Sequence, residues 1–146
     1  MSGDIETNPG PNNEVISNFK RNFSVATINV NGVKDKKKLK RVANFINTLP
    51  FRENSVICIQ ETHLANADIN SLRCQWRGEI VFSPSNGARG GVAILYKKAY
   101  FEEVTDSYFD ADARICSFTA VKNDETYYFL SIYAPTEHAN APQFYN

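Results

Sequence analysis

The apolar run VICI at residues 56–59, followed at once by Gln60 and Glu61, constrains the fold of this chain most strongly. Such a run is too short for a helix that stands alone, and its β-branched residues favour a strand buried on both faces. Ligand and catalytic sites of α/β sheets lie at the carboxyl ends of such strands. The sequence therefore predicts a central strand that presents Glu61 at a sheet edge. A surface glutamate where the chain leaves the core is the alternative.

The remaining patterns alternate between strand and helix. Residues 23–30 alternate in polarity and end in an Asn-Gly turn, which predicts a strand. Asp35 is placed to cap a helix that continues to about Thr48 and is closed by Pro50. Four apolar residues of this helix recur at helical spacing and predict one buried face: Leu39, Val42, Ala43 and Ile46.

The second half of the chain reads mainly as strands. We expect strands at residues 79–83 and 91–98, and a hairpin that pairs residues 114–121 with 126–133 across the turn sequence KNDE. The acidic segment at residues 102–112 shows no ligand spacing and is expected to be a solvated loop, and Trp76 is expected in the core. A strand, a helix, a strand and then hairpins predict a mixed sheet of the α/β or α+β class.

Charge is balanced overall and uneven along the chain. Sixteen basic and sixteen acidic residues cancel, so composition alone does not indicate a nucleic-acid partner. Residues 34–41, KDKKKLKR, nevertheless hold six basic residues and one acid. A local patch of this kind can attract phosphates, and a solvated helix face is the equal alternative.

Cysteine usage and hydropathy limit the compartment. The three cysteines show neither a CxxC spacing nor a Cys/His ligand spacing, which predicts no disulfide partners and a reducing compartment, nuclear or cytoplasmic. No apolar run approaches the length of a membrane span, so no membrane partner is expected.

Three predicted strands end in polar residues: Asn29 with Asn31, Gln60 with Glu61, and Tyr133. An oxygen-rich cluster of this kind suits a hard cation such as Mg²⁺, which keeps several waters that a phosphate can displace. One glutamate supplies too little charge to hold the ion alone. Further carboxylates or the substrate must therefore complete the coordination shell.

Four segments in series, TINVNG, CIQETHL, GGVAILYKK and SIYAP, resemble the amino-terminal half of the exonuclease–endonuclease–phosphatase superfamily. The His after QET and the GVAIL strand are most similar to the apurinic-type endonuclease of LINE-like, non-LTR retrotransposons. The resemblance covers about residues 23–144. It implies a partial two-sheet α/β sandwich, Mg²⁺ as cofactor with Mn²⁺ as the alternative, and DNA as the partner. Other retroelement-encoded proteins, such as the reverse transcriptase, are further implied partners.

The resemblance also implies roles for particular residues. Glu61 becomes the metal-binding carboxylate, Asn29 an active-site amide that orients and ligates the metal, and Tyr133 a hydroxyl beside the scissile phosphate. Asn31 stands where many relatives have Asp, and Thr136 stands where close relatives often have Asn. The expected DNA contacts are Lys36, Lys37, Lys38, Arg89 and Thr136.

The superfamily's later Gly-Asp-x-Asn and Ser-Asp-His motifs have no counterpart in this chain. We therefore expect residues 20–146 to be the amino-terminal portion of the domain, without its carboxy-terminal half and its general base, and inactive as this fragment. His63 is expected to be structural or DNA-adjacent, and His138 is given no role. Three alternatives stay open: a catalytically inactive nucleic-acid-binding module, a phosphatase or RNA-degrading relative, and a relic that does not fold stably.

The leader, residues 1–19, is expected to be flexible and contains the sequence GDIETNPGP. This stretch resembles the 2A-like ribosome-skipping peptide, which implies that the ribosome omits the bond between Gly10 and Pro11. A Pro/Gly-rich flexible leader without this activity is the alternative. The matching positions of the skipping motif are Asp4, Ile5, Glu6, Asn8, Pro9, Gly10 and Pro11.

Overall fold

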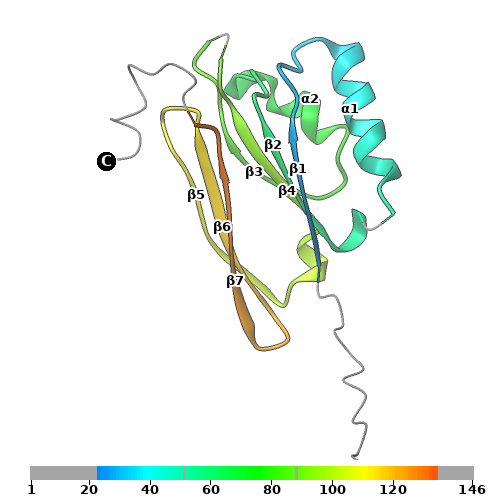
Figure 1. Cartoon of the computed structure of the whole chain (residues 1–146), viewed down its shortest axis with the longest axis vertical. Helices are drawn as coiled ribbons and strands as arrows, with labels where there is room; N and C mark the ends of the chain where they lie inside the picture. Colours follow the sequence, from blue (N-terminus) through cyan, green and yellow to red (C-terminus); the bar gives the residue numbers. More distant parts are fainter. Residues whose placement is uncertain (1–22, 51, 88, 135–146) are drawn as a thin grey trace, which may run out of the picture.

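The computed structural model describes residues 23–50, 52–87 and 89–134. Within them two β-sheets lie face to face, and helices cover the outer face of the first sheet (Figure 1). The skipping motif, Thr136 and His138 lie outside the described residues.

The first sheet is mixed and has the strand order β1-β2-β4-β3. β1 (Ser24–Asn29) runs parallel to β2 (Ser55–Gln60), whereas β4 (Val92–Tyr96) runs antiparallel to β2 and to β3 (Glu79–Ser83). The second sheet is antiparallel and consists of β5 (Glu103–Phe109), β6 (Ile115–Lys122) and β7 (Glu125–Ile132). This architecture confirms the predicted two-sheet α/β sandwich.

β2 is the central strand that the apolar run predicted. Ile57 and Ile59 pack under the helices, while Val56 and Cys58 face the second sheet, so the strand is buried on both sides. Burial of each aliphatic side chain contributes about 1.5–3 kcal/mol of transfer free energy. That contribution holds the end of β2, and with it the start of the Glu61 segment, at a defined position.

The helical layer follows the predicted cap and stripe. α1 (Lys36–Thr48) begins after Asp35, whose side chain accepts a hydrogen bond from the Lys38 backbone N–H at 2.8 Å. Leu39, Ala43 and Ile46 are buried against the sheet. The short helix α2 (Ile69–Arg73) and the buried Trp76 complete this layer. Three 3₁₀ turns lie in connections: η1 (Arg52–Asn54) before β2, η2 (Asn66–Asp68) before α2, and η3 (Lys98–Tyr100) between β4 and β5.

An aromatic cluster fills the space between the sheets. The Phe118 ring stacks on Tyr96 at 4.2 Å and on Phe129 at 4.8 Å between centroids, and Phe101 packs against the same rings. These four side chains are buried and join β4, β6 and β7. The two sheets therefore share one core.

Two features of the second sheet differ from the sequence prediction. Residues 103–109 form strand β5 rather than a solvated loop, because their backbone pairs with β6 while most of their side chains face solvent. Charged side chains are common on exposed edge strands, so composition alone did not distinguish this strand from a loop. The β6–β7 turn is also tighter than expected, since Lys122 already pairs with Glu125 and only Asn123 and Asp124 connect the strands.

Within the described residues, none of the helices has both the length and the hydropathy needed to cross a bilayer. Cys58 and Cys116 are buried, Cys74 is exposed, and all three are free thiols.

Candidate metal and phosphate site

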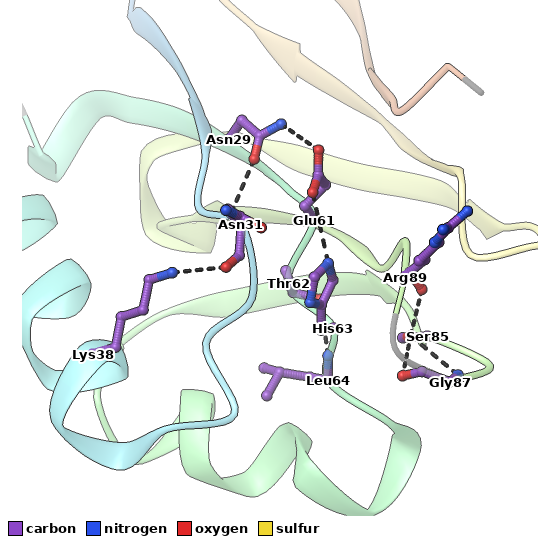
Figure 2. A network of polar contacts seen from close by, with 10 residues as sticks. All are labelled: Asn29, Asn31, Lys38, Glu61, Thr62, His63, Leu64, Ser85, Gly87 and Arg89. Atoms are coloured by element: carbon purple, nitrogen blue, oxygen red, sulfur yellow. Dashed lines mark hydrogen bonds and ion pairs between the residues drawn. The ribbon is translucent and has the colours of Figure 1, made fainter. Parts of the chain in front are cut away.

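The strand ends bring Asn29 and Glu61 together. Asn29 is the last residue of β1 and pairs in register with Gln60, so the residue that follows β2 lies beside it. The Asn29 Nδ2 donates a hydrogen bond to Glu61 Oε1 at 2.7 Å, and Asn29 Oδ1 accepts one from the Asn31 backbone N–H at 3.0 Å (Figure 2). Because a backbone N–H can face only the oxygen of the amide, this second bond defines the amide orientation.

This orientation places the two ends of the Asn29 amide against different partners. Its NH₂ group restrains the carboxylate of Glu61, while its oxygen faces the main chain of Asn31. The amide oxygen keeps a second lone pair, so the role of Asn29 as a metal ligand stays a prediction. The observed contact of Asn29 is with the Glu61 carboxylate.

The backbone around Glu61 is held in an unusual conformation. Glu61 (φ 54°) and His63 (φ 55°) are both left-handed, which costs an L-residue about 1–2 kcal/mol. Four backbone hydrogen bonds around this segment oppose that cost: Val30 N to Gln60 O (3.0 Å), Gly32 N to Glu61 O (2.6 Å), Thr62 N to Gly91 O (2.9 Å) and His63 N to Gly90 O (3.0 Å). Strain of this kind persists where the surrounding structure holds it, and it is frequent at functional sites.

His63 lies between Glu61 and the β1–α1 loop. Its Nε2 is 3.6 Å from Glu61 Oε2, and its ring packs so closely on Gly32 that a Cβ there would lie 2.6 Å from Nδ1. The imidazole thus supports the second carboxylate oxygen from below in Figure 2. This placement is consistent with the structural role expected from the sequence.

Tyr133 enters the site from the second sheet. It directly follows β7, its backbone N–H donates to Arg114 O at 2.8 Å, and its hydroxyl lies near the Glu61 carboxylate. Burial, and then the neighbouring Glu61 carboxylate, raise the pKa of Tyr133, while Arg114 and Arg89 partly oppose the rise. The phenol therefore stays protonated at neutral pH and can donate a hydrogen bond.

Gln60 and Ser131 join the two sheets at this end of the molecule, a link that the sequence did not reveal. The Gln60 Nε2 donates to Ser131 Oγ at 3.1 Å, and Gln60 Oε1 accepts from Thr27 Oγ1 at 3.2 Å. No local pattern connects positions 71 residues apart. The polar residue Gln60 at the end of β2 was the only indication in the sequence, and it did not indicate Ser131 as its partner.

The predicted basic contacts are spread around the site rather than gathered in it. Lys36 and Lys37 are exposed in the first turn of α1. Lys38 is half-buried, and its ammonium group donates to Asn31 O at 2.7 Å, so it stabilises the β1–α1 loop. Lys34, outside the predicted set, donates to Gly87 O at 3.4 Å, and Arg89 is exposed on the same loop as Gly87.

A family model described as the Endonuclease/Exonuclease/phosphatase family matches residues 26–145. The chain belongs to this family. Members of the family typically depend on a divalent metal. A curated relative, the "Transposon TX1 uncharacterized 149 kDa protein" of Xenopus laevis, is 25% identical over 123 residues, which are 84% of this chain and 9% of that protein. The chain thus spans less than a tenth of the length of this relative.

The donor chemistry of the site fits such a metal in part. Glu61 offers a carboxylate whose side chain is 19% exposed, so an ion can reach it. The part of the chain that the structure describes contains no group of three or more His, Cys, Asp or Glu that could hold a metal. One carboxylate suits a hard cation that keeps most of its waters and binds a phosphate, as Mg²⁺ does.

Proposed function

We propose that this chain contributes to a Mg²⁺-dependent DNA endonuclease of a non-LTR retrotransposon, with Mn²⁺ as the alternative metal. The observation that carries the proposal is the Glu61 carboxylate, which accepts a hydrogen bond from Asn29 at 2.7 Å and has the protonated Tyr133 nearby. Membership of the family supports phosphodiester hydrolysis, and the similarity to a transposon protein supports the retroelement origin.

In this proposal Glu61 holds the metal, which supplies Lewis-acid activation of the phosphate and of the leaving oxygen when it is bound. Asn29 keeps the carboxylate in one orientation, so little rearrangement is needed when the ion arrives. The Tyr133 hydroxyl is a neutral donor that the second sheet brings near Glu61. It is placed to hydrogen-bond a phosphate oxygen once Glu61 turns to the metal.

Activation of the attacking water requires a further group. His63 is the single histidine in the described part of the chain, and its carboxylate neighbour is the proposed metal ligand Glu61 rather than an aspartate. We therefore propose that the general base and the remaining metal ligands lie outside the described residues. On this basis the described residues, 23–50, 52–87 and 89–134, are not expected to nick DNA by themselves.

Direct measurement of metal binding tests the central claim. Mn²⁺ titration followed by electron paramagnetic resonance should show a bound ion in the full chain, weakened at least tenfold by Glu61→Gln, which corresponds to about 1.4 kcal/mol. Glu79→Gln is the matched control, because Glu79 is an exposed glutamate at the other end of the first sheet. Equal affinities for the wild type and Glu61→Gln would refute the proposal.

Supercoiled-plasmid nicking in Mg²⁺ tests the reaction itself. Nicking that is lost both in EDTA and in Glu61→Gln would show that the chain holds a complete site and that the general base is not missing. Metal-dependent nicking that persists in Glu61→Gln would refute the assignment of Glu61.

A catalytically inactive nucleic-acid-binding module is the second candidate. It is favoured by the single carboxylate and by the lack of an Asp–His pair around His63 in the described residues. DNA binding that is salt-dependent, unaffected by Mg²⁺ and unaffected by Glu61→Gln would support this module instead.

The leader, the compartment and the protein partners remain proposals. We propose ribosome skipping between Gly10 and Pro11, a nuclear or cytoplasmic location, and association with a reverse transcriptase of the same element. In-vitro translation of the chain with an upstream reporter should release the reporter as a separate product. A Pro11→Ala variant that gives the same two products would contradict the skipping proposal.

A further inference from the structure

An open depression of about 380 Å³ lies beside the carboxylate site. One wall is the loop that precedes β4, and the other is the β5–β6 turn. The charged residues that line it are Arg89, Asp112 and Arg114. Two guanidinium groups and one carboxylate give the depression a net positive charge.

The two walls are joined, although they belong to different sheets. The Asn86 Nδ2 donates to Ala111 O at 2.7 Å, and the Gly91 backbone N–H donates to Ala113 O at 2.7 Å. Gly90 lies so close to the turn that a Cβ would be 3.0 Å from Ala113 O. The depression is therefore a built feature of the fold rather than a gap between independent loops.

The position of Arg114 is set by Asp110. The Asp110 Oδ1 accepts hydrogen bonds from the backbone N–H groups of Arg114 at 3.0 Å and Ile115 at 2.8 Å, and from Ser83 Oγ at 2.7 Å. This arrangement ties the β5–β6 turn to the end of β3 in the other sheet. The backbone that carries Arg114 is thus held by two hydrogen bonds to one carboxylate oxygen, which the Ser83 hydroxyl also holds.

Arg114, which lines the depression, also contacts Tyr133. The Arg114 guanidinium carbon is 5.6 Å from the centre of the Tyr133 ring, and its Nη1 donates to Tyr133 O at 3.4 Å. Arg89 lines the same depression from the loop that precedes β4. In Figure 2 the Arg89 side chain points upward from its loop, to the right of Glu61. The depression and the carboxylate site are therefore neighbours: Gly90, which lines the depression, accepts a hydrogen bond from the His63 backbone N–H at 3.0 Å, and Arg114 contacts Tyr133.

We propose that this depression binds a backbone phosphate of the DNA strand, adjacent to the phosphate held at Glu61, and that Arg114 and Arg89 recognise it. The proposal rests on the proposed function for the identity of the ligand as DNA. A guanidinium fork donates two parallel hydrogen bonds to a phosphate, which an ammonium group cannot match. Occupation of this subsite would fix the register of the strand, so that the next phosphate lies over Glu61 and Tyr133.

The salt dependence of DNA binding tests the subsite without any catalysis. Fluorescence anisotropy with a labelled duplex in EDTA would compare the full wild-type chain with Arg114→Gln, Arg89→Gln and Arg114→Lys. Each Gln variant should reduce the slope of log Kobs against log salt by about 0.9, the value for one lost phosphate contact. Arg114→Lys should keep the slope and still bind more weakly.

Lys98→Gln is the matched control, because Lys98 is an exposed cation in η3, at the end of β4 away from the depression. Its slope should stay close to that of the wild type. If both Gln variants at Arg114 and Arg89 match Lys98→Gln in slope and affinity, or if the wild-type chain does not bind the duplex, the subsite assignment is overturned.

A scan of the DNA supplies a test that does not depend on the folding of a variant. Single neutral methylphosphonates would replace each phosphate in turn along one strand. Replacement of one particular phosphate should weaken DNA binding by the wild type. The same replacement should cause no further loss of affinity in Arg114→Gln or Arg89→Gln. Additive losses at every position would refute the subsite. Because no readout here uses metal or cleavage, this result stands apart from the Mn²⁺ and nicking outcomes that judge the proposed function.

Discussion

Replacement of Gly91 by alanine should damage the fold and the site together. Gly91 has φ +83°, and a Cβ there would lie 2.4 Å from Thr62 Oγ1 and 3.2 Å from His63 N. The left-handed backbone costs alanine about 1–2 kcal/mol. Overpacking against the fully buried Thr62 adds about 1–3 kcal/mol, since a buried β-branched side chain has little room to move. The expected loss is about 2–5 kcal/mol, out of the 5–15 kcal/mol that is typical of a domain.

Urea unfolding measured by circular dichroism would give the free energy of unfolding. Gly90→Ala is the matched control: its φ is +72°, and its Cβ would meet Ala113 O at the milder distance of 3.0 Å, so it should lose less than Gly91→Ala. Thr62→Ala removes the clashing oxygen and one hydrogen bond from the Leu64 N–H at 3.3 Å. The double variant with Gly91→Ala should therefore be about 1–3 kcal/mol more stable than the sum of the single losses.

If the stability losses of Gly91→Ala and Thr62→Ala add in the double variant, the clash between the new Cβ and Thr62 is refuted. A Gly91→Ala variant as stable as the wild type would also refute the cost assigned to the left-handed backbone. The same contact also predicts a functional effect. Because Thr62 lies between Glu61 and His63, a folded Gly91→Ala protein should bind Mn²⁺ more weakly than Gly90→Ala does.

The remaining predictions concern the turn, the strained glutamate and the thiols. Asp124→Gly should stabilise the protein by about 0.5–1 kcal/mol in urea unfolding, because Asp124 is left-handed (φ 61°) in a two-residue hairpin turn where glycine is preferred. Glu61→Gly should be about 1–2 kcal/mol more stable than Glu61→Ala, since only glycine accepts φ 54° without strain; equal stability would contradict this. In a thiol titration at neutral pH only Cys74 should react quickly, and rapid reaction of all three thiols in the folded protein would contradict the packing. Burial raises the pKa of Cys58 and Cys116 above the ordinary 9.0, so their contribution to stability is complete below that pH and should be lost as the pH rises above it.

The sequence was most informative where one short segment determines its own environment. The VICI run predicted a strand buried on both faces because four consecutive apolar residues leave no polar face. Asp35 predicted the start of α1 because a cap acts on the backbone three residues away. The convergence of Asn29 and Glu61 followed from the pairing of parallel strands that end at the same edge.

The features that the sequence could not predict depend on contacts between distant segments. β5 was misread because its pairing with β6 uses backbone groups, while its side chains resemble those of a loop. Arg114 gave no signal of its own, and its relation to Tyr133 arises from the register of the hairpin and from Asp110. The left-handed conformation of Glu61 could not be predicted either, because a glutamate in a sequence does not indicate positive φ.

The strained backbone at Glu61 gives a physical reason why the site needs residues from both sheets. A left-handed glutamate is stable only if neighbouring backbone satisfies its hydrogen bonds, and those partners come from the glycines before β4 and after β1. Its carboxylate then needs donors from both sides: Asn29 at the end of β1, and Tyr133 from the second sheet. The Gln60–Ser131 bond holds the sheets together one residue before the strained position. A site built in this way forms only when both sheets are packed, because neither sheet alone supplies all of the partners of Glu61.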